Sequence, residues 1–198
     1  MKKFTRLPPE ARKQEIRQAA LALFTEKGFG ATTMENIVQR VSLSKGGVYR
    51  LYPSTQAILT DLILEGMHLR NAFYEDRVRQ ETGRGTGLSL HALVEMIADS
   101  LLLYPEISGI YVEFLLEKRR NTQLEQLYQQ ISRRSLEETR ALIQAFGAED
   151  LLMNAGRLKK LEDLMNGSIL AIQVLGLSQD FLRDRGRMIR VFEAYLKE

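Results

Sequence analysis

The chain has 198 residues, of which 44% are hydrophobic and 27% charged, a balance typical of globular proteins and not of disordered ones. It contains no cysteine, which excludes a disulfide framework and a thiolate metal site. No stretch approaches the roughly 18 apolar residues that a membrane-spanning helix requires, and the basic N-terminus lacks the apolar region of a secretory signal. We therefore expect a cytoplasmic protein that does not enter a membrane.

Charge is unevenly distributed along the chain. Residues 1–54 contain ten lysines and arginines against four acidic residues, whereas the remainder contains 18 basic and 21 acidic side chains. A basic N-terminal quarter on a mildly acidic body indicates that one part meets a polyanion. A solvated basic surface without a partner is the alternative, and charge alone does not decide between them.

The N-terminal quarter predicts one long and two short helices. The long helix follows the proline pair at positions 8 and 9, carries an apolar stripe and ends at Gly28. Thr32 and Glu35 have the spacing of a capping box, which predicts a short helix up to about Val41. Ser44 is placed to cap a second short helix that runs to about residue 52.

The rest of the chain also has helical periodicity, and no segment has the pattern of a strand. A longer helix is expected from about residue 54 to residue 80, followed by a glycine-rich linker at 82–87. Further helices are predicted near 88–103, 106–119, 121–146, 157–176 and 178–197. The predicted fold class is therefore all-α.

Two short helices joined by a tight turn, after a longer supporting helix, are typical of a helix-turn-helix. Its second helix enters the major groove of DNA with its N-terminal residues nearest the bases. Glycines in the first turn let the backbone approach the DNA closely and present its N–H groups. A flexible loop is the alternative interpretation, with both tyrosines of the segment in a core, and for Tyr52 we do expect burial. We predict DNA contacts from Thr33, Ser44, Lys45, Gly46, Gly47, Tyr49 and Arg50.

Residues 16–59 resemble the N-terminal domain of the TetR family of transcriptional regulators. The shared parts are "AA" and "LF" in the first helix, then "KGF", the "TT" pair and "SKGGVY". The resemblance implies a helix-turn-helix DNA-binding domain at 1–54 and a larger helical ligand-binding and dimerisation domain at 55–198. It further implies a homodimeric repressor that binds a pseudo-palindromic operator in double-stranded DNA. A small-molecule effector of unidentified chemistry would release it, and no cofactor is expected.

The chain departs from the family's usual pattern at several positions. Val38 and Val41 stand where alanine is usual, Ser42 where the turn usually has glycine, and Thr55 where a lysine commonly contacts phosphate. A serine adopts a positive φ only at some cost, so the turn is expected to differ slightly. The basic tail at 1–6 either reaches the DNA backbone or stays without structure.

The two C-terminal segments are apolar on more than one side, so each must bury two sides. One side can face the chain's own core and the other a second copy, which is where the resemblance places the dimer interface. A wholly intramolecular core is the alternative. The predicted interface residues are Leu161, Leu164, Met165, Ser168, Ile172, Phe181, Met188 and Phe192.

Aromatic and flexible apolar side chains on the middle helices are candidates for a ligand pocket, although such residues also form ordinary cores. The predicted ligand contacts are Asn71, Met96, Tyr111, Phe114 and Tyr128. His91 and Glu95 lie four residues apart, but two such groups make a poor metal site, so we expect a solvated pair and no metal. No catalytic trio is apparent, and we do not expect an enzyme. Two other interpretations remain, a small helical enzyme or carrier and an adaptor that binds anionic lipid.

Overall fold

The computed structural model describes residues 8–82, 88–145 and 155–197, and every regular element within these ranges is a helix. The predicted basic tail at 1–6 lies outside the described residues. The predicted linker at 82–87 does so as well, except for residue 82, which is the last residue of α4. The elements are α1 (Pro9–Lys27), α2 (Met34–Arg40), α3 (Lys45–Leu51), α4 (Thr55–Thr82), α5 (Leu90–Ser100), α6 (Pro105–Glu117), the short 3-10 helix η1 (Lys118–Arg120), α7 (Thr122–Ala145), α8 (Ala155–Leu175), α9 (Ser178–Arg183) and α10 (Arg185–Lys197).

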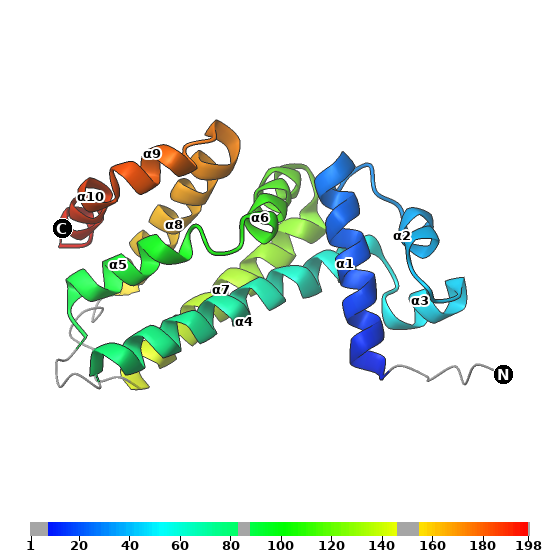
Figure 1. Cartoon of the computed structure of the whole chain (residues 1–198), viewed down its shortest axis with the longest axis horizontal. Coiled ribbons are helices and arrows are strands. Elements are labelled where there is room, and N and C mark those ends of the chain that lie inside the picture. The colour runs from blue at the N-terminus through cyan, green and yellow to red at the C-terminus, as the bar shows by residue number, and fades with distance from the viewer. Residues whose placement is uncertain (1–7, 83–87, 146–154, 198) are drawn as a thin grey trace.

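Helix α4 joins the two ends of the molecule. Its 28 residues correspond to about 40 Å of helix. Figure 1 shows α1, α2 and α3 gathered at one end of α4, with α5, α8, α9 and α10 towards the other end and α7 alongside. The first helix, α1, and the last helix, α10, consequently lie at opposite ends of the molecule.

Two apolar clusters hold the helices together. The N-terminal core contains side chains from α1, α2, α3, the first half of α4, α6 and α7, whereas the C-terminal core contains side chains from the rest of α4 and from α5, α7, α8, α9 and α10. Phe114 of α6 is fully buried in the N-terminal core, and truncating a phenylalanine of this kind to alanine costs about 3–5 kcal/mol. Because α4, α6 and α7 contribute to the N-terminal core, α1–α3 are firmly packed on the rest of the chain.

Several helix ends carry local capping signals, of which the stop at Gly28 was predicted from the sequence. Gly28 ends α1 with φ 85°, a conformation that glycine adopts without strain. Ser89 caps α5, its Oγ accepting a hydrogen bond from the amide of Ala92 at 3.1 Å. Pro105 opens α6 at its first turn, where the missing N–H has no intrahelical partner to lose.

One predicted helix, at 178–197, is divided in two. The chain leaves helical geometry at Asp184, with φ −102° and ψ 19°, and α10 begins at the next residue. Gly186 follows within the first turn of α10, and glycine has a low helix propensity. The periodicity continues across this break, which is why the sequence alone suggested a single helix.

Candidate nucleic-acid interface and internal cavity

Helix α3 begins where its cap predicts. Ser44 is extended, with φ −65° and ψ 155°, and its Oγ accepts a hydrogen bond from the amide of Gly47 at 3.2 Å. A Cβ added at Gly46 would meet nothing within 4 Å, whereas one at Gly47 would lie 3.3 Å from Ser44 Oγ. The two glycines therefore differ, since Gly46 faces open space and Gly47 faces the turn.

One side of α3 is buried and the other is exposed and basic. Val48 and the capping residue Tyr52 are buried in the N-terminal core, which confirms the expected burial of Tyr52. The side chains of Lys45, Tyr49 and Arg50 lie on the exposed side. The predicted DNA contacts Thr33, Ser44 and Gly46 are exposed as well, and Gly47 is half-buried. No finding tests their contact with DNA, so all seven stay predictions.

The capping box of α2 lies one residue later than predicted. Thr33, not Thr32, is the N-cap: its Oγ1 accepts from the amide of Asn36 at 3.3 Å, and Asn36 Oδ1 accepts from the amide of Thr33 at 3.0 Å. Thr32 is buried and donates its hydroxyl to the carbonyl of Gly28 at 2.9 Å. Glu35 is thereby left free of the cap.

Glu35 instead contacts two of the predicted DNA-binding side chains. Its Oε1 accepts from Lys45 Nζ at 2.6 Å and from the Tyr49 hydroxyl at 3.4 Å. The hydrogen bond from Lys45 lowers the pKa of Glu35, and the same bond raises the pKa of Lys45. Lys45 Nζ also lies 5.7 Å from the centre of the Tyr49 ring. In the free protein, the Glu35 carboxylate therefore links the side chains of Lys45 and Tyr49 on the exposed face of α3. No local sequence pattern indicated these contacts.

The turn between α2 and α3 accommodates Ser42 without a positive φ. Among the described residues only glycines have positive φ, so Ser42 is not strained. Its amide donates to Glu15 Oε1 of α1 at 2.5 Å. The turn thus differs from a glycine turn, as expected, and a side chain of α1 compensates by satisfying the backbone.

A polar cluster fastens α1 and α3 to the start of α4. Arg17 lies 3.1 Å from Asp61 and 2.9 Å from Glu65, both on α4, and 3.0 Å from Glu10. The Tyr52 hydroxyl donates a short hydrogen bond to Asp61. Burial raises the pKa of Tyr52, and although burial also acts to raise that of Asp61, the hydrogen bonds from Tyr52 and Arg17 lower the pKa of Asp61 overall. Movement of α4 at this point must therefore move the helix-turn-helix.

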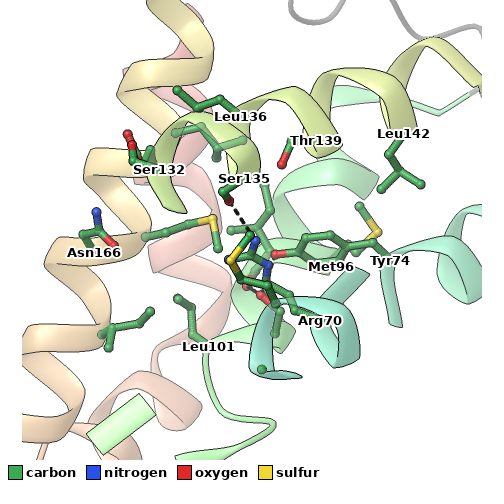
Figure 2. Close-up of a pocket in the computed structure, with 18 of the residues that line it drawn as sticks. Arg70, Tyr74, Met96, Leu101, Ser132, Ser135, Leu136, Thr139, Leu142 and Asn166 are labelled. Atoms are coloured by element: carbon green, nitrogen blue, oxygen red, sulfur yellow. Dashed lines mark hydrogen bonds between the residues drawn. The ribbon is translucent and has the colours of Figure 1, made fainter. Parts of the chain in front are cut away.

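A partly open cavity lies between α4, α5, α6, α7 and α8 (Figure 2). Its volume is about 130 Å³, and more than half of its lining side chains are those of isoleucine, leucine, valine or methionine. Of the predicted ligand contacts, Met96 and Tyr111 line it. Asn71, Phe114 and Tyr128 do not line it, because Asn71 bonds Glu138 and the two rings pack in or against the N-terminal core. As no ligand contact is tested, these five stay predictions.

The polar groups of the cavity come from five helices, α4 to α8, and of those described next only Tyr111 was predicted from the sequence. Arg70 Nη2 donates to Ser135 Oγ at 3.0 Å, and the Tyr111 hydroxyl donates to Asn166 Oδ1 at 3.1 Å. Tyr74 shares a 2.8 Å hydrogen bond with Ser100 Oγ. Burial raises the pKa of both tyrosines, so each phenol stays protonated and polar at neutral pH. Figure 2 shows Arg70 and Tyr74 on α4 facing α7.

Helix α6 passes from the cavity to the helix-turn-helix. Ile107 and Tyr111 on this helix line the cavity. Two residues after Tyr111, Glu113 Oε2 accepts a hydrogen bond from the amide of Phe29 at 2.5 Å. Phe29 belongs to the segment between α1 and α2, so α6 connects the cavity wall directly to the helix-turn-helix region.

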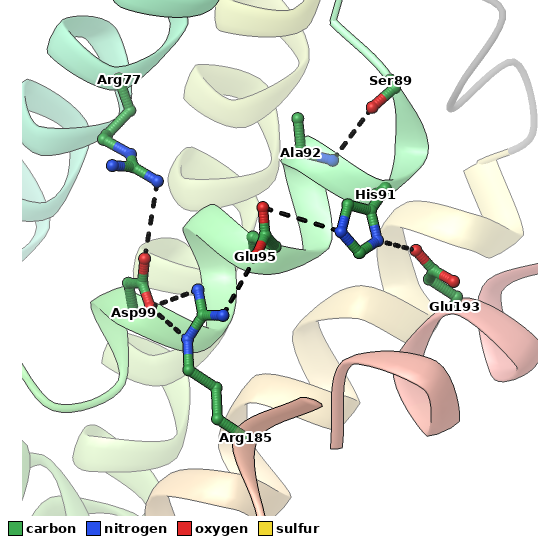
Figure 3. Close-up of polar contacts among 8 residues, drawn as sticks. All are labelled: Arg77, Ser89, His91, Ala92, Glu95, Asp99, Arg185 and Glu193. Carbon is green, nitrogen blue, oxygen red and sulfur yellow. Dashed lines mark hydrogen bonds and ion pairs between the residues drawn. The ribbon is translucent and has the colours of Figure 1, made fainter. Parts of the chain in front are cut away.

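The terminal helix α10 is held on α5 by ion pairs (Figure 3). Arg185 lies 2.8 Å from Asp99 and 3.1 Å from Glu95, and His91 Nδ1 lies 2.6 Å from Glu193. His91 is thus part of a contact between helices, in addition to its predicted pairing with Glu95 at 3.8 Å. Within the described ranges, no group of three potential ligands is suited to a metal ion.

The predicted interface residues lie mostly inside the chain's own fold. Leu161, Ile172, Phe181 and Phe192 are buried in the C-terminal core, while Leu164, Met165 and Met188 pack against it and Ser168 is half-buried. These eight stay predictions as an interface. Other apolar side chains of α8–α10 and their junctions are exposed, namely Val174, Leu175, Leu177, Leu182, Val191 and Tyr195. None of the helices in the described part of the chain is long and apolar enough to cross a membrane.

Comparison with known proteins agrees with this arrangement. The sequence model of the bacterial regulatory proteins of the tetR family matches residues 16–62. YfiR of Bacillus subtilis (strain 168), an uncharacterized HTH-type transcriptional regulator, is 37% identical over 65 residues. That match spans 33% of this chain and about a third (32%) of the length of YfiR.

Solved structures extend the likeness to the whole fold. Salmonella enterica GusR superposes with a TM-score of 0.74 at 20% identity, over 97% of this chain and 98% of GusR. A protein from Saccharomonospora viridis, described as a transcriptional regulator and solved in complex with choline, has a TM-score of 0.56 at 18% identity, over 96% of this chain and 95% of its own. At these identities the likeness concerns the fold. The likeness to the tetR family of bacterial regulatory proteins therefore lies in residues 16–62, which contain the helix-turn-helix, and the solved structures show that the all-helical body shares their fold.

Proposed function

We propose that the protein is a transcriptional repressor that binds a pseudo-palindromic operator as a homodimer and leaves it when a small molecule occupies the cavity. The observation that carries this proposal is the outer face of α3. Its first turn is open at Gly46, and the side chains beside it are the exposed Lys45, Tyr49 and Arg50. A short helix with a bare, basic N-terminal face suits the major groove and its flanking phosphates.

Dimerisation is supported by the apolar residues that α8–α10 leave in solvent. Val174 and Leu175 at the end of α8 are 60% and 67% exposed, and Val191 on α10 is 55% exposed. Burial of such side chains is worth about 1.5–3 kcal/mol each. A second copy that packs α8 and α10 against the same helices would cover them, and a symmetric pair would present two α3 helices to two half-sites.

Release by a ligand is supported by two connections between the cavity and the DNA-facing helices. Helix α4 lines the cavity with Arg70 and Tyr74, and the same helix holds Arg17 of α1 through Asp61. Helix α6 lines it with Ile107 and reaches the segment between α1 and α2 through Glu113. A ligand that separates α4 from α6 would therefore change the angle of the helix-turn-helix, and the two α3 helices would no longer match the spacing of the half-sites.

The first experiment measures binding to DNA from either side of the protein's own gene by fluorescence anisotropy, with unrelated DNA of equal length beside it. We expect one fragment to bind more tightly and Arg50→Ala to weaken that binding. Arg140→Ala is the matched control, because Arg140 is also an exposed arginine but belongs to α7 and not to α3. Equal binding of all duplexes by the wild type, or equal loss in both variants, would contradict the proposal.

The dimer is tested by sedimentation with Val191→Glu. We expect a shift from dimer to monomer, because the substitution puts a charge into a proposed apolar interface. Leu116→Glu is the control, since Leu116 is 51% exposed but lies on α6. If Val191→Glu remains a dimer, α10 does not form the proposed interface.

A further inference from the structure

Arg70 is the one basic side chain among the described residues that line the cavity, and its guanidinium is only partly satisfied. Its Nη2 donates to the neutral hydroxyl of Ser135 at 3.0 Å, and its charge lies 5.9 Å from the centre of the Tyr74 ring. Its Nε is buried and has no hydrogen-bond partner. Within the described ranges, no carboxylate lies within 4.0 Å of this guanidinium.

Arg17 has the acidic partners that Arg70 lacks within the described ranges. Arg17 is the corresponding arginine of the N-terminal half of the molecule, and three carboxylates lie within 3.1 Å of its guanidinium. An arginine does not relieve burial by losing its proton, so an enclosed guanidinium needs an anion or several hydrogen bonds. Arg17 Nε is likewise buried without a well-aligned hydrogen bond, but a carboxylate oxygen of Glu65 lies 2.9 Å from it. Arg70 has one neutral hydrogen bond and, within the described ranges, no carboxylate beside it.

Among the described residues of the cavity wall, the one acidic side chain does not balance this charge. Glu162 Oε2 pairs with Lys159 Nζ at 3.1 Å, and its Oε1 accepts a short hydrogen bond from Ser132. Glu162 therefore has a cationic partner on its own helix, Lys159, which also pairs with Asp163 at 2.5 Å. Glu162 forms no ion pair with Arg70, whose charge has no acidic partner within the described ranges.

We propose that the cavity binds a small organic carboxylate with an apolar body, and that Arg70 holds its carboxylate group. The Nε and Nη2 groups form one edge of the guanidinium, and that edge matches the two oxygens of a carboxylate. The aliphatic wall receives the rest of the molecule. A dry cavity of about 150 Å³ accepts benzene, so the 130 Å³ measured here suits a single ring or a short chain. The inference rests on the proposed function, since it names the chemistry of the effector.

The carboxylate also lies where it can act on the fold. Arg70 is on α4 and its present partner Ser135 is on α7. Gly66, one turn earlier on α4, is so close to α6 that an added Cβ would lie 2.6 Å from Ile107 Cγ2. A ligand that draws Arg70 away from Ser135 and fills the space beside Ile107 would therefore shift α4 against α6, the two helices that reach the helix-turn-helix.

The test is calorimetric titration of the DNA-free, full-length protein with benzoate, phenylacetate, hexanoate and octanoate, each paired with its primary amide. We expect at least one acid to bind and its amide to bind at least about tenfold more weakly, as charge-assisted hydrogen bonds are roughly twice as strong as neutral ones. Arg70→Gln should weaken the acid at least about tenfold and leave the amide unchanged. Arg70→Lys should retain part of the affinity, because it keeps the charge and loses the two-point geometry.

Two further variants separate binding from a structural role. Glu162→Gln should not weaken the acid, because it leaves Arg70 intact. Arg70→Met should raise the Tm of the ligand-free protein, since it replaces an uncompensated charge by an apolar side chain of similar length. A lower Tm for Arg70→Met would show that Arg70 stabilises the ligand-free protein, and this result would overturn the proposal.

The remaining outcomes are distinct. Acid and amide binding equally, or no acid binding in the millimolar range, overturns the carboxylate assignment, while operator binding measured separately leaves the proposed regulator standing. An acid that binds through Arg70 without releasing the protein from its operator supports the site and contradicts the proposed release. An acid that both binds and releases the operator supports the two together.

Discussion

Replacing Gly46 by alanine separates stability from DNA binding. Gly46 is the second residue of α3, its φ is not positive, and an added Cβ would meet nothing within 4 Å. Alanine therefore fits the free protein and restricts the unfolded chain. We expect the free energy of unfolding to rise by about 0.4–1 kcal/mol, which corresponds to an increase in Tm of about 1–4 °C for a chain of this size.

The same methyl group should weaken binding to the operator. It would project from the face that carries Lys45, Tyr49 and Arg50, where the proposed complex brings the backbone against DNA. Forcing a methyl group into a packed contact costs about 1–3 kcal/mol. The expected loss of affinity is therefore about 5- to 150-fold for each half-site.

The change in stability is measured by thermal denaturation monitored by circular dichroism. The change in operator affinity is measured by fluorescence anisotropy. Gly109→Ala is the control: its Cβ would lie 3.6 Å from Gln173 Oε1, an ordinary contact, so it should raise stability and leave DNA binding unchanged. A Gly46→Ala protein that is more stable and binds the operator as tightly as the wild type would refute the placement of α3. A less stable one would refute the reasoning about its first turn.

Three other substitutions test the polar contacts of the DNA-facing half. Glu35→Gln should raise affinity for any duplex severalfold, as measured by anisotropy at low salt, because it releases Lys45 from an acidic partner and removes a negative charge near phosphate. Asp61→Asn should lower the free energy of unfolding by about 1–3 kcal/mol. Because the folded-state pKa of Asp61 lies below its ordinary 3.8, the stabilisation is complete above that value and lost as the pH falls below it, so in urea titrations variant and wild type should converge in acid. Glu113→Gln should leave ligand affinity unchanged and raise the ligand concentration needed for release from the operator, as the contact between α6 and the segment before α2 is weakened.

The helices α1, α2 and α3 were predictable from the sequence because their signals are local. The proline pair and Gly28 bound α1, and Ser44 caps α3 through an amide three residues away. A cap depends on residues within one turn of the helix end, so the sequence contains all of it. Even here the prediction erred by one residue at α2, because Thr32 and Thr33 are both followed three residues later by a side chain able to complete a box.

The exposed face of α3 could be predicted for the same reason, but its contact with Glu35 of α2 could not. Burial of Val48 and Tyr52 follows from helical spacing, which leaves Lys45, Tyr49 and Arg50 outside. That Glu35 holds Lys45 depends on the angle at which α2 and α3 pack, ten residues apart in the chain.

The cavity was decided by tertiary structure alone. Arg70 and Ser135 are separated by 65 residues, and neither stands out in a helical sequence of ordinary polarity. Aromatic residues suggested a pocket but belong mostly to the core, since aromatic side chains fill cores as readily as they line sites. The sequence by itself determined the helices and the side of α3 that meets solvent, because both depend on neighbours along the chain. Which charges are paired, which apolar side chains remain exposed and where space is left between helices depend on packing between distant segments, and only the folded chain decides them.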